Sequence, residues 1–167
     1  MNGNYFKASL DALAKNLSIA LTLVFVSTIA IQLWLMKENG QQASLFIVAL
    51  LLVIYLSAYL FRPQGYTVTT DALIIKRSVS PVTIVRNSIV SAEQLHDNSL
   101  SGSIRLFGVG GLFGYFGKFS NSKLGKMTWY ATRRNRNVIL LLTNDQKKII
   151  VTPDEPAAFL QALQNKI

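Results

Sequence analysis

Two long blocks that contain neither a charged residue nor a proline constrain this chain more than any other feature of its sequence. Residues 17–36 and 43–61 together hold 39 residues without Asp, Glu, Lys, Arg, His or Pro. As helices, these 20 and 19 residues would each extend about 30 Å, which is the thickness of the hydrocarbon core of a bilayer. Residues 62–167 suffice for one domain but not for covering two such helices on all sides. The blocks exclude a plain soluble or disordered chain and predict a transmembrane helical hairpin over residues 17–61.

The positive charges around the two blocks predict how the hairpin is oriented. Five basic residues lie on the side of the two termini, namely Lys7, Lys15, Arg62, Lys76 and Arg77. The link at 37–42 carries one Lys, one Glu and an Asn-Gly turn signal. The positive-inside rule therefore places both termini and the segment after residue 61 in the cytoplasm, as in a multi-pass membrane protein. A cleaved signal peptide is disfavoured, because the first block is too long and a second follows at once.

Apolar residues ahead of the first block recur at helical spacing. Steps of four, three and four separate Phe6, Leu10, Leu13 and Leu17, and another face holds Lys7, Asp11 and Lys15. We therefore expect an amphipathic N-terminal segment over residues 1–16, helical between 4 and 16. It would lie at the cytoplasmic interface, extend the first span, or pack against the C-terminal domain.

Beyond residue 62 the sequence changes to short runs of apolar and β-branched residues separated by turns. The predicted strands are 66–69, 73–76, 82–85, 89–95, 103–107, 127–132, 138–143 and 148–151. Many short strands at such close spacing favour an antiparallel sandwich or a small barrel. Residues 62–167 are therefore predicted to form one mainly-β domain.

The end of the chain carries a different pattern, which predicts one helix over residues 154–165. Asp154 is the expected N-cap, Pro156 is tolerated in the first turn, and an apolar face follows. This helix would cover an open end of the barrel, with Phe159 packing onto the strands. The expected core comprises Tyr66, Val68, Ile75, Ile84, Trp129, Ile139, Leu141, Ile150 and Phe159.

Glycine is concentrated in one segment, where six of the ten glycines fall between positions 102 and 117. One interpretation is a loop whose backbone approaches a phosphate-bearing ligand, and the other is a bent strand with bulges at a barrel corner. A dinucleotide-binding fingerprint that starts at Gly108 and Gly110 would need a third glycine where Phe113 stands. The spacing therefore favours the bent strand.

Several stretches of the C-terminal part resemble the bacterial pleckstrin-homology-like (PH) domain family. The resemblance covers residues 63–165 and rests on Gly-Leu-Phe-Gly-Tyr-Phe-Gly-Lys-Phe at 111–119, on 124–125, on 130–132 and on the closing 151–159. Thr-Pro-Asp-Glu-Pro-Ala-Ala-Phe at 152–159 is its most specific part. The resemblance implies a PH-like barrel of about seven antiparallel strands in two sheets with a C-terminal helix. It also implies one or two N-terminal spans, no enzymatic activity, and a place in the bacterial inner (cytoplasmic) membrane.

No constellation of residues predicts catalysis or metal binding. His96 is the only histidine, and with Glu93 and Asp97 it makes a poor transition-metal set. The chain has no cysteine, which excludes thiolate sites and disulfides. We expect His96 in a solvated loop, and no catalytic residue, metal or cofactor.

The distribution of charge predicts an anionic partner. Residues 62–167 hold fourteen basic and six acidic side chains, and no acid occurs between Asn98 and Asn144. The candidate anion-binding residues are Arg133, Arg134 and Arg136 in one turn and, as a second set, Lys118, Lys123 and Lys126. A positive-inside bias explains part of the excess, and contact with anionic headgroups would explain the rest.

The function predicted from these features is a non-enzymatic, membrane-anchored PH-like module that scaffolds a partner or binds anionic phospholipid. A first alternative is an accessory subunit of a larger membrane complex that docks through the hairpin. A second is nucleic-acid binding by the basic and aromatic stretch 105–136, against which the membrane anchor and the lack of an RNP1-type motif weigh. A protein partner or a second copy of the chain stays open.

Overall fold

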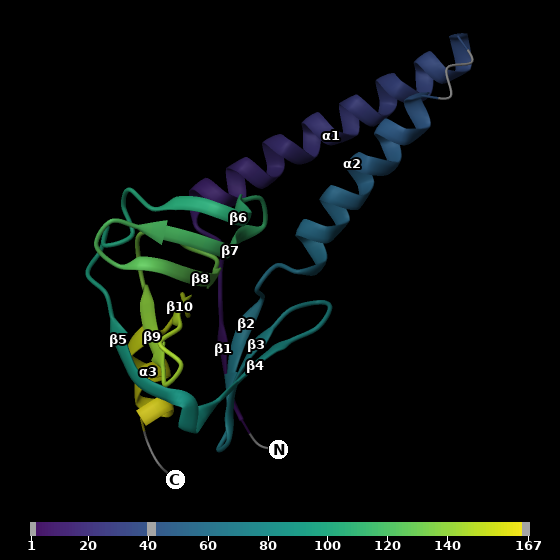
Figure 1. The fold of residues 1–167 in the computed structure, drawn as a ribbon. Helices are drawn as coiled ribbons and strands as arrows, with labels where there is room; N and C mark the ends of the chain where they lie inside the picture. The colour runs from purple at the N-terminus through teal and green to yellow at the C-terminus, as the bar shows by residue number, and fades with distance from the viewer. Residues whose placement is uncertain (1–2, 40–42, 165–167) are drawn as a thin grey trace.

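A mainly-β domain from which two long helices project makes up the computed structural model of this chain, which describes residues 3–39 and 43–164 (Figure 1). The first three elements are β1 (Asn4–Lys7), α1 (Ala12–Asn39) and α2 (Ala43–Leu60). The strands that follow are β2 (Gly65–Val68), β3 (Ala72–Lys76), β4 (Val82–Val85), β5 (Ile89–Gln94), β6 (Ile104–Gly111), β7 (Gly114–Asn121), β8 (Gly125–Ala131), β9 (Ile139–Thr143) and β10 (Lys148–Val151). A short 3-10 turn, η1 (Arg86–Ser88), links β4 to β5, and α3 (Pro156–Gln164) ends the described chain. Residue 165 and the Gly40 of the predicted turn lie outside the described residues.

The helices α1 and α2 lie side by side and extend away from the strands (Figure 1). Asp11 caps α1, because its carboxylate accepts the backbone N–H of Ala14 at 2.7 Å. Within the described residues, α1 alone is both long and apolar enough to cross a membrane, with a mean hydropathy of 2.2 over its most apolar window. The apolar helix α2 is shorter, at 18 residues. The predicted two-span hairpin therefore stays a prediction for α2.

The N-terminal segment is not the amphipathic helix expected over residues 4–16. Asn4–Lys7 forms β1, which pairs antiparallel with β2, so that Lys7 lies opposite Gly65. The helix α1 begins only at Ala12. The apolar side chain of Phe6 has a tertiary partner here, since its ring meets that of Phe159 edge-on at 5.3 Å. Tertiary pairing has overridden a helical spacing that is short and weak.

The strands form two sheets, one in the order β1-β2-β3-β4 and one in the order β5-β9-β10-β8-β7-β6. The prediction of about seven antiparallel strands is wrong in two respects. Nine strands follow α2 in the described residues, and β10 pairs parallel with β8. The parallel pair arises because β10 returns from its hairpin with β9 and enters the sheet between β9 and β8. The missed strand is β7, which begins in the glycine-rich segment.

The glycine-rich segment forms the β6–β7 hairpin, which confirms the bent-strand interpretation. Gly111 lies opposite Gly114 across a two-residue turn, and the register shifts between Arg105 and Phe107. Gly108 has a φ of +111°, and a Cβ there would lie 2.3 Å from the carbonyl oxygen of Phe116. Only glycine allows the two strands to approach so closely at this point.

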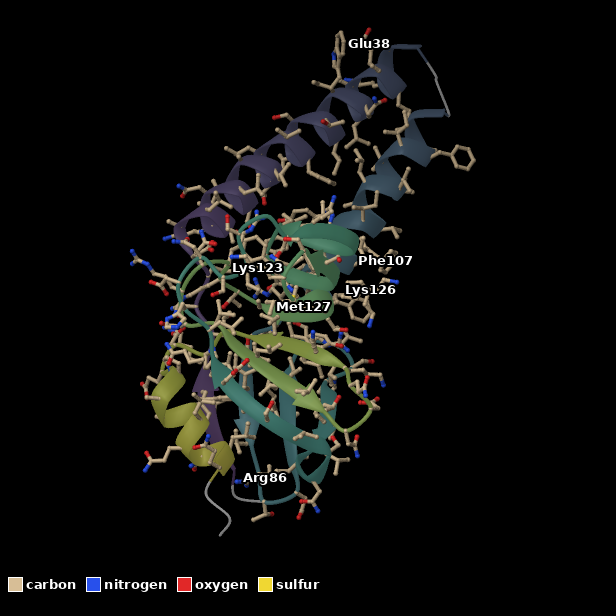
Figure 2. All side chains as sticks on the ribbon, turned by 60° about the vertical axis from the view of Figure 1, so that its left-hand side comes forward. Glu38, Arg86, Phe107, Lys123, Lys126 and Met127 are labelled. Atoms are coloured by element: carbon tan, nitrogen blue, oxygen red, sulfur yellow. The ribbon has the colours of Figure 1, made fainter. Side chains whose placement is uncertain are left out.

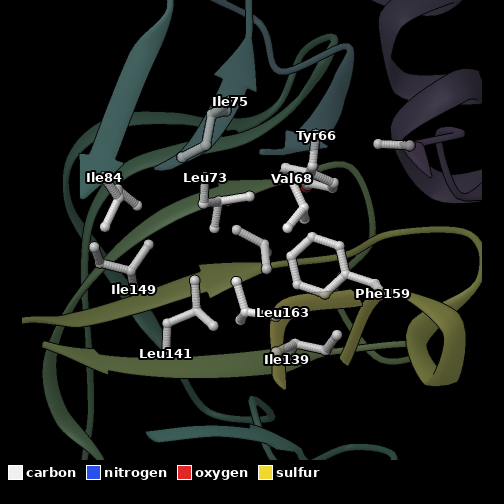
Figure 3. Packing of buried hydrophobic residues seen from close by; sticks show 12 residues of the cluster. Tyr66, Val68, Leu73, Ile75, Ile84, Ile139, Leu141, Ile149, Phe159 and Leu163 are labelled. Atoms are coloured by element: carbon white, nitrogen blue, oxygen red, sulfur yellow. The ribbon is translucent and has the colours of Figure 1, made fainter. Parts of the chain in front are cut away.

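All nine residues predicted for the core are buried. Seven of them lie in the cluster between the two sheets and α3, whereas Trp129 and Ile150 lie in a second cluster with Tyr115 and Phe119. Phe159 projects from α3 onto the strands, with its ring 5.8 Å from that of Tyr66 (Figure 3). The Tyr66 hydroxyl donates to the carbonyl of Tyr130 at 2.6 Å and accepts the N–H of Thr152 at 2.9 Å. Burial raises the pKa of Tyr66 to about 12.

Candidate functional site

The turn at residues 133–136, named here the arginine turn, is neutralised in part by the fold. A carboxylate oxygen of Asp154 lies 2.6 Å from the guanidinium of Arg133. The guanidinium of Arg134 donates to the carbonyl of Ser103 at 3.2 Å. Arg136 is the arginine of this turn that is exposed. The three arginines therefore do not form one free cationic cluster.

Asp154, which pairs with Arg133 of the arginine turn, was predicted to be the N-cap of the C-terminal helix. Asp154 does not cap α3, because its carboxylate accepts the N–H and the hydroxyl of Ser9 at 2.8 and 2.6 Å. Burial alone would raise the pKa of Asp154, but these hydrogen bonds and the charge of Arg133 hold it below its usual value. Asp154 thus ties the segment ahead of α1 to the end of β8.

A second acid ties the start of α1 to the same turn. Besides capping the helix, the carboxylate of Asp11 accepts the backbone N–H of Arg134 at 3.1 Å. The hydroxyl of Tyr115 lies 3.4 Å from the same carboxylate. Burial first, and then the charge of Asp11, raise the pKa of Tyr115 to about 12. The arginine turn therefore serves as a joint between the helix and the β domain.

The predicted lysine set lies partly on the outer face of β7 and β8. The ammonium of Lys118 donates to the hydroxyl of Thr128 at 2.7 Å, and Lys126 lies opposite Ser120 in the ladder. Lys123 is exposed in the turn between these strands. Figure 2 shows Lys126 and Phe107 on one side of the domain beneath the helices, with Arg86 at the opposite end. The outer face of β7 and β8 thus lies at the end of the domain from which the two long helices project.

A groove of about 870 Å³ lies between α2 and the outer face of β6, β7 and β8. We call it the cationic groove, and it is lined by Val53, Ile54, Ser57, Ala58, Phe61, Arg77, Arg105, Phe107, Gly108, Val109, Gly110, Leu112, Phe116, Gly117, Lys118, Thr128 and Tyr130. Three of these residues are cationic, none is acidic, and most of the others are apolar. Residues of α2 form one wall of the groove, and the glycines of the β6–β7 hairpin, which have no side chains, line its floor.

The three cations of the groove are held in different ways. The guanidinium of Arg77 donates to the carbonyl of Ser80 and lies over the ring of Phe61, at 5.4 Å. Lys118 keeps the bond to Thr128 already described. Arg105 is exposed beside the bulge of β6, and its guanidinium has no hydrogen-bond or ion-pair partner within residues 3–39 and 43–164. An anion in the groove would meet these charges without displacing a carboxylate.

A second hollow, of about 590 Å³, lies beside the arginine turn, but its charges differ. Asp11 lines it together with Arg133 and Arg136, and Arg133 is already paired with Asp154. The cationic groove therefore offers the stronger field for an anion. Sequence reasoning missed Arg77 and Arg105 as site residues, because they come from separate elements and form no local motif.

Two other predictions concern the same region of the chain. Within the stretch 105–136 the rings of Tyr115, Phe116, Phe119 and Trp129 are buried and are not available for stacking on bases, whereas the ring of Phe107 is exposed. His96 is exposed after β5, as expected. No group of three His, Asp or Glu side chains that could hold a metal occurs in the part of the chain that the structure describes.

Two β-sheets with a C-terminal helix packed over their core define a PH-like domain. The profile of the family described as bacterial PH domain matches residues 64–167. The chain therefore belongs to the bacterial PH domain family, whose members are in general not catalytic. The match begins after α2, so β1 and both long helices lie outside it. No curated protein and no solved structure matches the chain.

Proposed function

We propose that this protein is a two-pass, membrane-anchored PH-like module that binds anionic phospholipid at the cytoplasmic face of a bacterial inner membrane. The observation that carries the proposal is the cationic groove, in which Arg77, Arg105 and Lys118 face an apolar helix without any acid. PH domains commonly bind lipids or proteins, and this groove combines the chemistry of a lipid headgroup with that of an acyl chain.

The pairing of β1 with β2 supports the two-pass topology. β1 precedes α1 and β2 follows α2, and their hydrogen bonds require both strands to lie on the same side of a membrane. If α1 crosses the bilayer, α2 must therefore return across it. At 18 residues, α2 would extend about 27 Å, close to the thickness of a hydrocarbon core. The excess of basic residues on the side of the strands supports a cytoplasmic position for that side.

This topology divides the molecule into an anchor at 17–61 and a β domain at 62–167 to which β1 adds a strand. The headgroup phosphate would lie at Arg105 and Lys118, where a guanidinium can bind two phosphate oxygens at once. An acyl chain would follow Val53, Ile54 and Phe116. Lys123, Lys126 and Arg136 would add to the field at the membrane surface, whereas Arg133 and Arg134 hold the fold.

The lipids that accompany the full-length protein through purification in a mild detergent test the proposal. We expect phosphatidylglycerol or another anionic lipid to be retained and to be detected by native mass spectrometry. The double variant Arg105→Gln with Lys118→Gln should bind phosphatidylglycerol about 10–30 times more weakly, at about 1 kcal/mol per basic side chain. The matched control is Lys7→Gln with Lys147→Gln, which removes the same charge at two exposed sites outside the groove.

Equal weakening in both double variants would attribute the binding to net charge and would contradict a site in the groove. Retention of no anionic lipid by the wild-type protein would contradict lipid binding altogether. If a protein then co-purified in stoichiometric amount, the accessory-subunit alternative would replace the proposal.

A further inference from the structure

The tip of the β6–β7 hairpin lies between the two long helices. The N–H of Phe113 donates to the hydroxyl of Ser18 at 2.7 Å, and the Phe113 ring lies 5.3 Å from that of Tyr55. A Cβ on Gly111 would come within 2.4 Å of the Leu17 side chain, so the tip and α1 are in close contact. Ser18 and Leu17 belong to the first apolar block. The tip of the β domain therefore reaches the depth at which α1 has already become uncharged.

The same hairpin exposes a row of large apolar side chains. On β6, the exposed fractions of Ile104, Leu106 and Phe107 are 67%, 54% and 79%. β6 is the edge strand of its sheet and the strand nearest to α1 (Figure 1). An exposed apolar edge strand is a site of aggregation in water unless something covers it.

The surroundings of the row indicate what covers it. Phe107 lies opposite Lys118 in the ladder, and Lys126 lies on the same side of the domain (Figure 2). Apolar and aromatic side chains beside lysines are typical of the headgroup region, where amines reach phosphates and the apolar parts reach acyl chains. Phe107 also lines the cationic groove together with Val53 and Ile54, so this end of the row adjoins the apolar surface of α2.

We infer that the β6–β7 hairpin is immersed in the bilayer interface, with Ile104, Leu106 and Phe107 in contact with lipid acyl chains. This inference rests on the proposed function in one respect, namely that α1 and α2 lie in the bilayer. The hairpin is then a third membrane contact, which fixes the tilt of the β domain. It also opens the cationic groove sideways to the bilayer, so that a lipid enters the groove without leaving the membrane.

The absence of cysteine makes the inference directly testable. Single variants Phe107→Cys and Ile104→Cys carry a nitroxide in the full-length protein, reconstituted in vesicles of phosphatidylethanolamine and phosphatidylglycerol. For each nitroxide, the rate of collision with oxygen, which concentrates in lipid, is compared with the rate of collision with a water-soluble nickel chelate. The references are Leu23→Cys on α1 and Val90→Cys on β5, whose native side chains are 63% and 65% exposed.

We expect the labels at 104 and 107 to resemble the label at 23, with an oxygen-to-nickel collision ratio several-fold above that at 90. If the label at 107 has the low collision ratio of the label at 90, while the label at 23 has the high ratio expected in lipid, the inference is overturned and the membrane anchor is unaffected. Protection of 107 from both reagents with spin–spin broadening would overturn it in favour of a second copy covering β6. A water-like label at 23 would overturn the inference together with the proposed topology.

Discussion

The arginine turn and the cationic groove carry the same kind of charge in opposite surroundings. At the turn, Asp154 and Asp11 come from distant parts of the chain and accept hydrogen bonds from it. At the groove, three cations face apolar side chains and none of the lining residues is acidic. A cluster of arginines in the sequence therefore predicts a charge, but the fold decides whether that charge is free for a ligand.

The largest effect on stability is expected at the floor of the groove, at Gly108→Ala. The new Cβ would collide with the carbonyl of Phe116 in a backbone conformation that alanine rarely adopts. The cost should be about 2–4 kcal/mol, from overpacking and strain together. Thermal unfolding of the full-length protein in detergent measures it.

Gly110→Ala is the matched control for this change. Its Cβ would meet the side chain of Arg105 at an ordinary 3.5 Å, so stability should change by less than about 0.5 kcal/mol. Equal costs at the two glycines would show that the close approach of β6 and β7 does not constrain the groove.

A smaller but substantial loss is expected for Asp154→Asn at neutral pH. The variant leaves Arg133 without its ion pair and weakens the hydrogen bonds from Ser9. The free energy of unfolding should fall by about 1–3 kcal/mol. Because the pKa of Asp154 is lowered in the folded protein, its contribution is fully present above the ordinary value of 3.8. That contribution is lost as the pH falls through the folded pKa.

The difference in unfolding free energy between wild type and Asp154→Asn should therefore shrink below pH 3.8, as urea titrations at several pH values would measure. A difference that stays constant into the acid range would mean that the charge of Asp154 contributes nothing to the joint.

The smallest effect separates two neighbours in the arginine turn. Arg133→Gln should lower the unfolding free energy by about 1 kcal/mol, because it breaks a partly buried ion pair. Arg136→Gln should leave stability unchanged and weaken binding of the protein to anionic vesicles about fivefold, as expected for one surface cation. Thermal unfolding measures stability, and vesicle flotation measures binding, for both variants. A stability loss in Arg136→Gln together with a binding loss in Arg133→Gln would contradict the roles assigned to these two arginines.

The sequence predicted those parts of the fold that local patterns encode. The apolar blocks, most of the strands, the terminal helix and the burial of Phe159 follow from periodicity within short windows. β1 was missed because four residues give almost no strand signal and their partner lies about 60 residues away. β7 was missed because glycine lowers strand propensity, although here it permits the close approach of β6.

The candidate site was less accessible to sequence reasoning for a related reason. The ion pair of Arg133 with Asp154 joins residues 21 apart, and the bond from Arg134 to Asp11 joins residues 123 apart. Arg77 and Arg105 line the same groove only because the end of β3 and the bulge of β6 both lie beside α2. Contacts between residues so far apart in the sequence follow from no local pattern. The lysine set and the arginine turn could therefore be identified, but the residues that surround them could not.

The pairing of β1 with β2 also sets an order of events during synthesis. Lys7 leaves the ribosome about 60 residues before its partner Gly65, an interval of about 3–12 s at ordinary elongation rates. Throughout that interval β1 has no strand to pair with, while α1 and α2 emerge. The four-stranded sheet closes only after both helices have been made and brought back together. Completion of the four-stranded sheet therefore depends on the antiparallel return of α2 alongside α1, and a nascent chain in which the two helices stay apart keeps β1 without its partner strand.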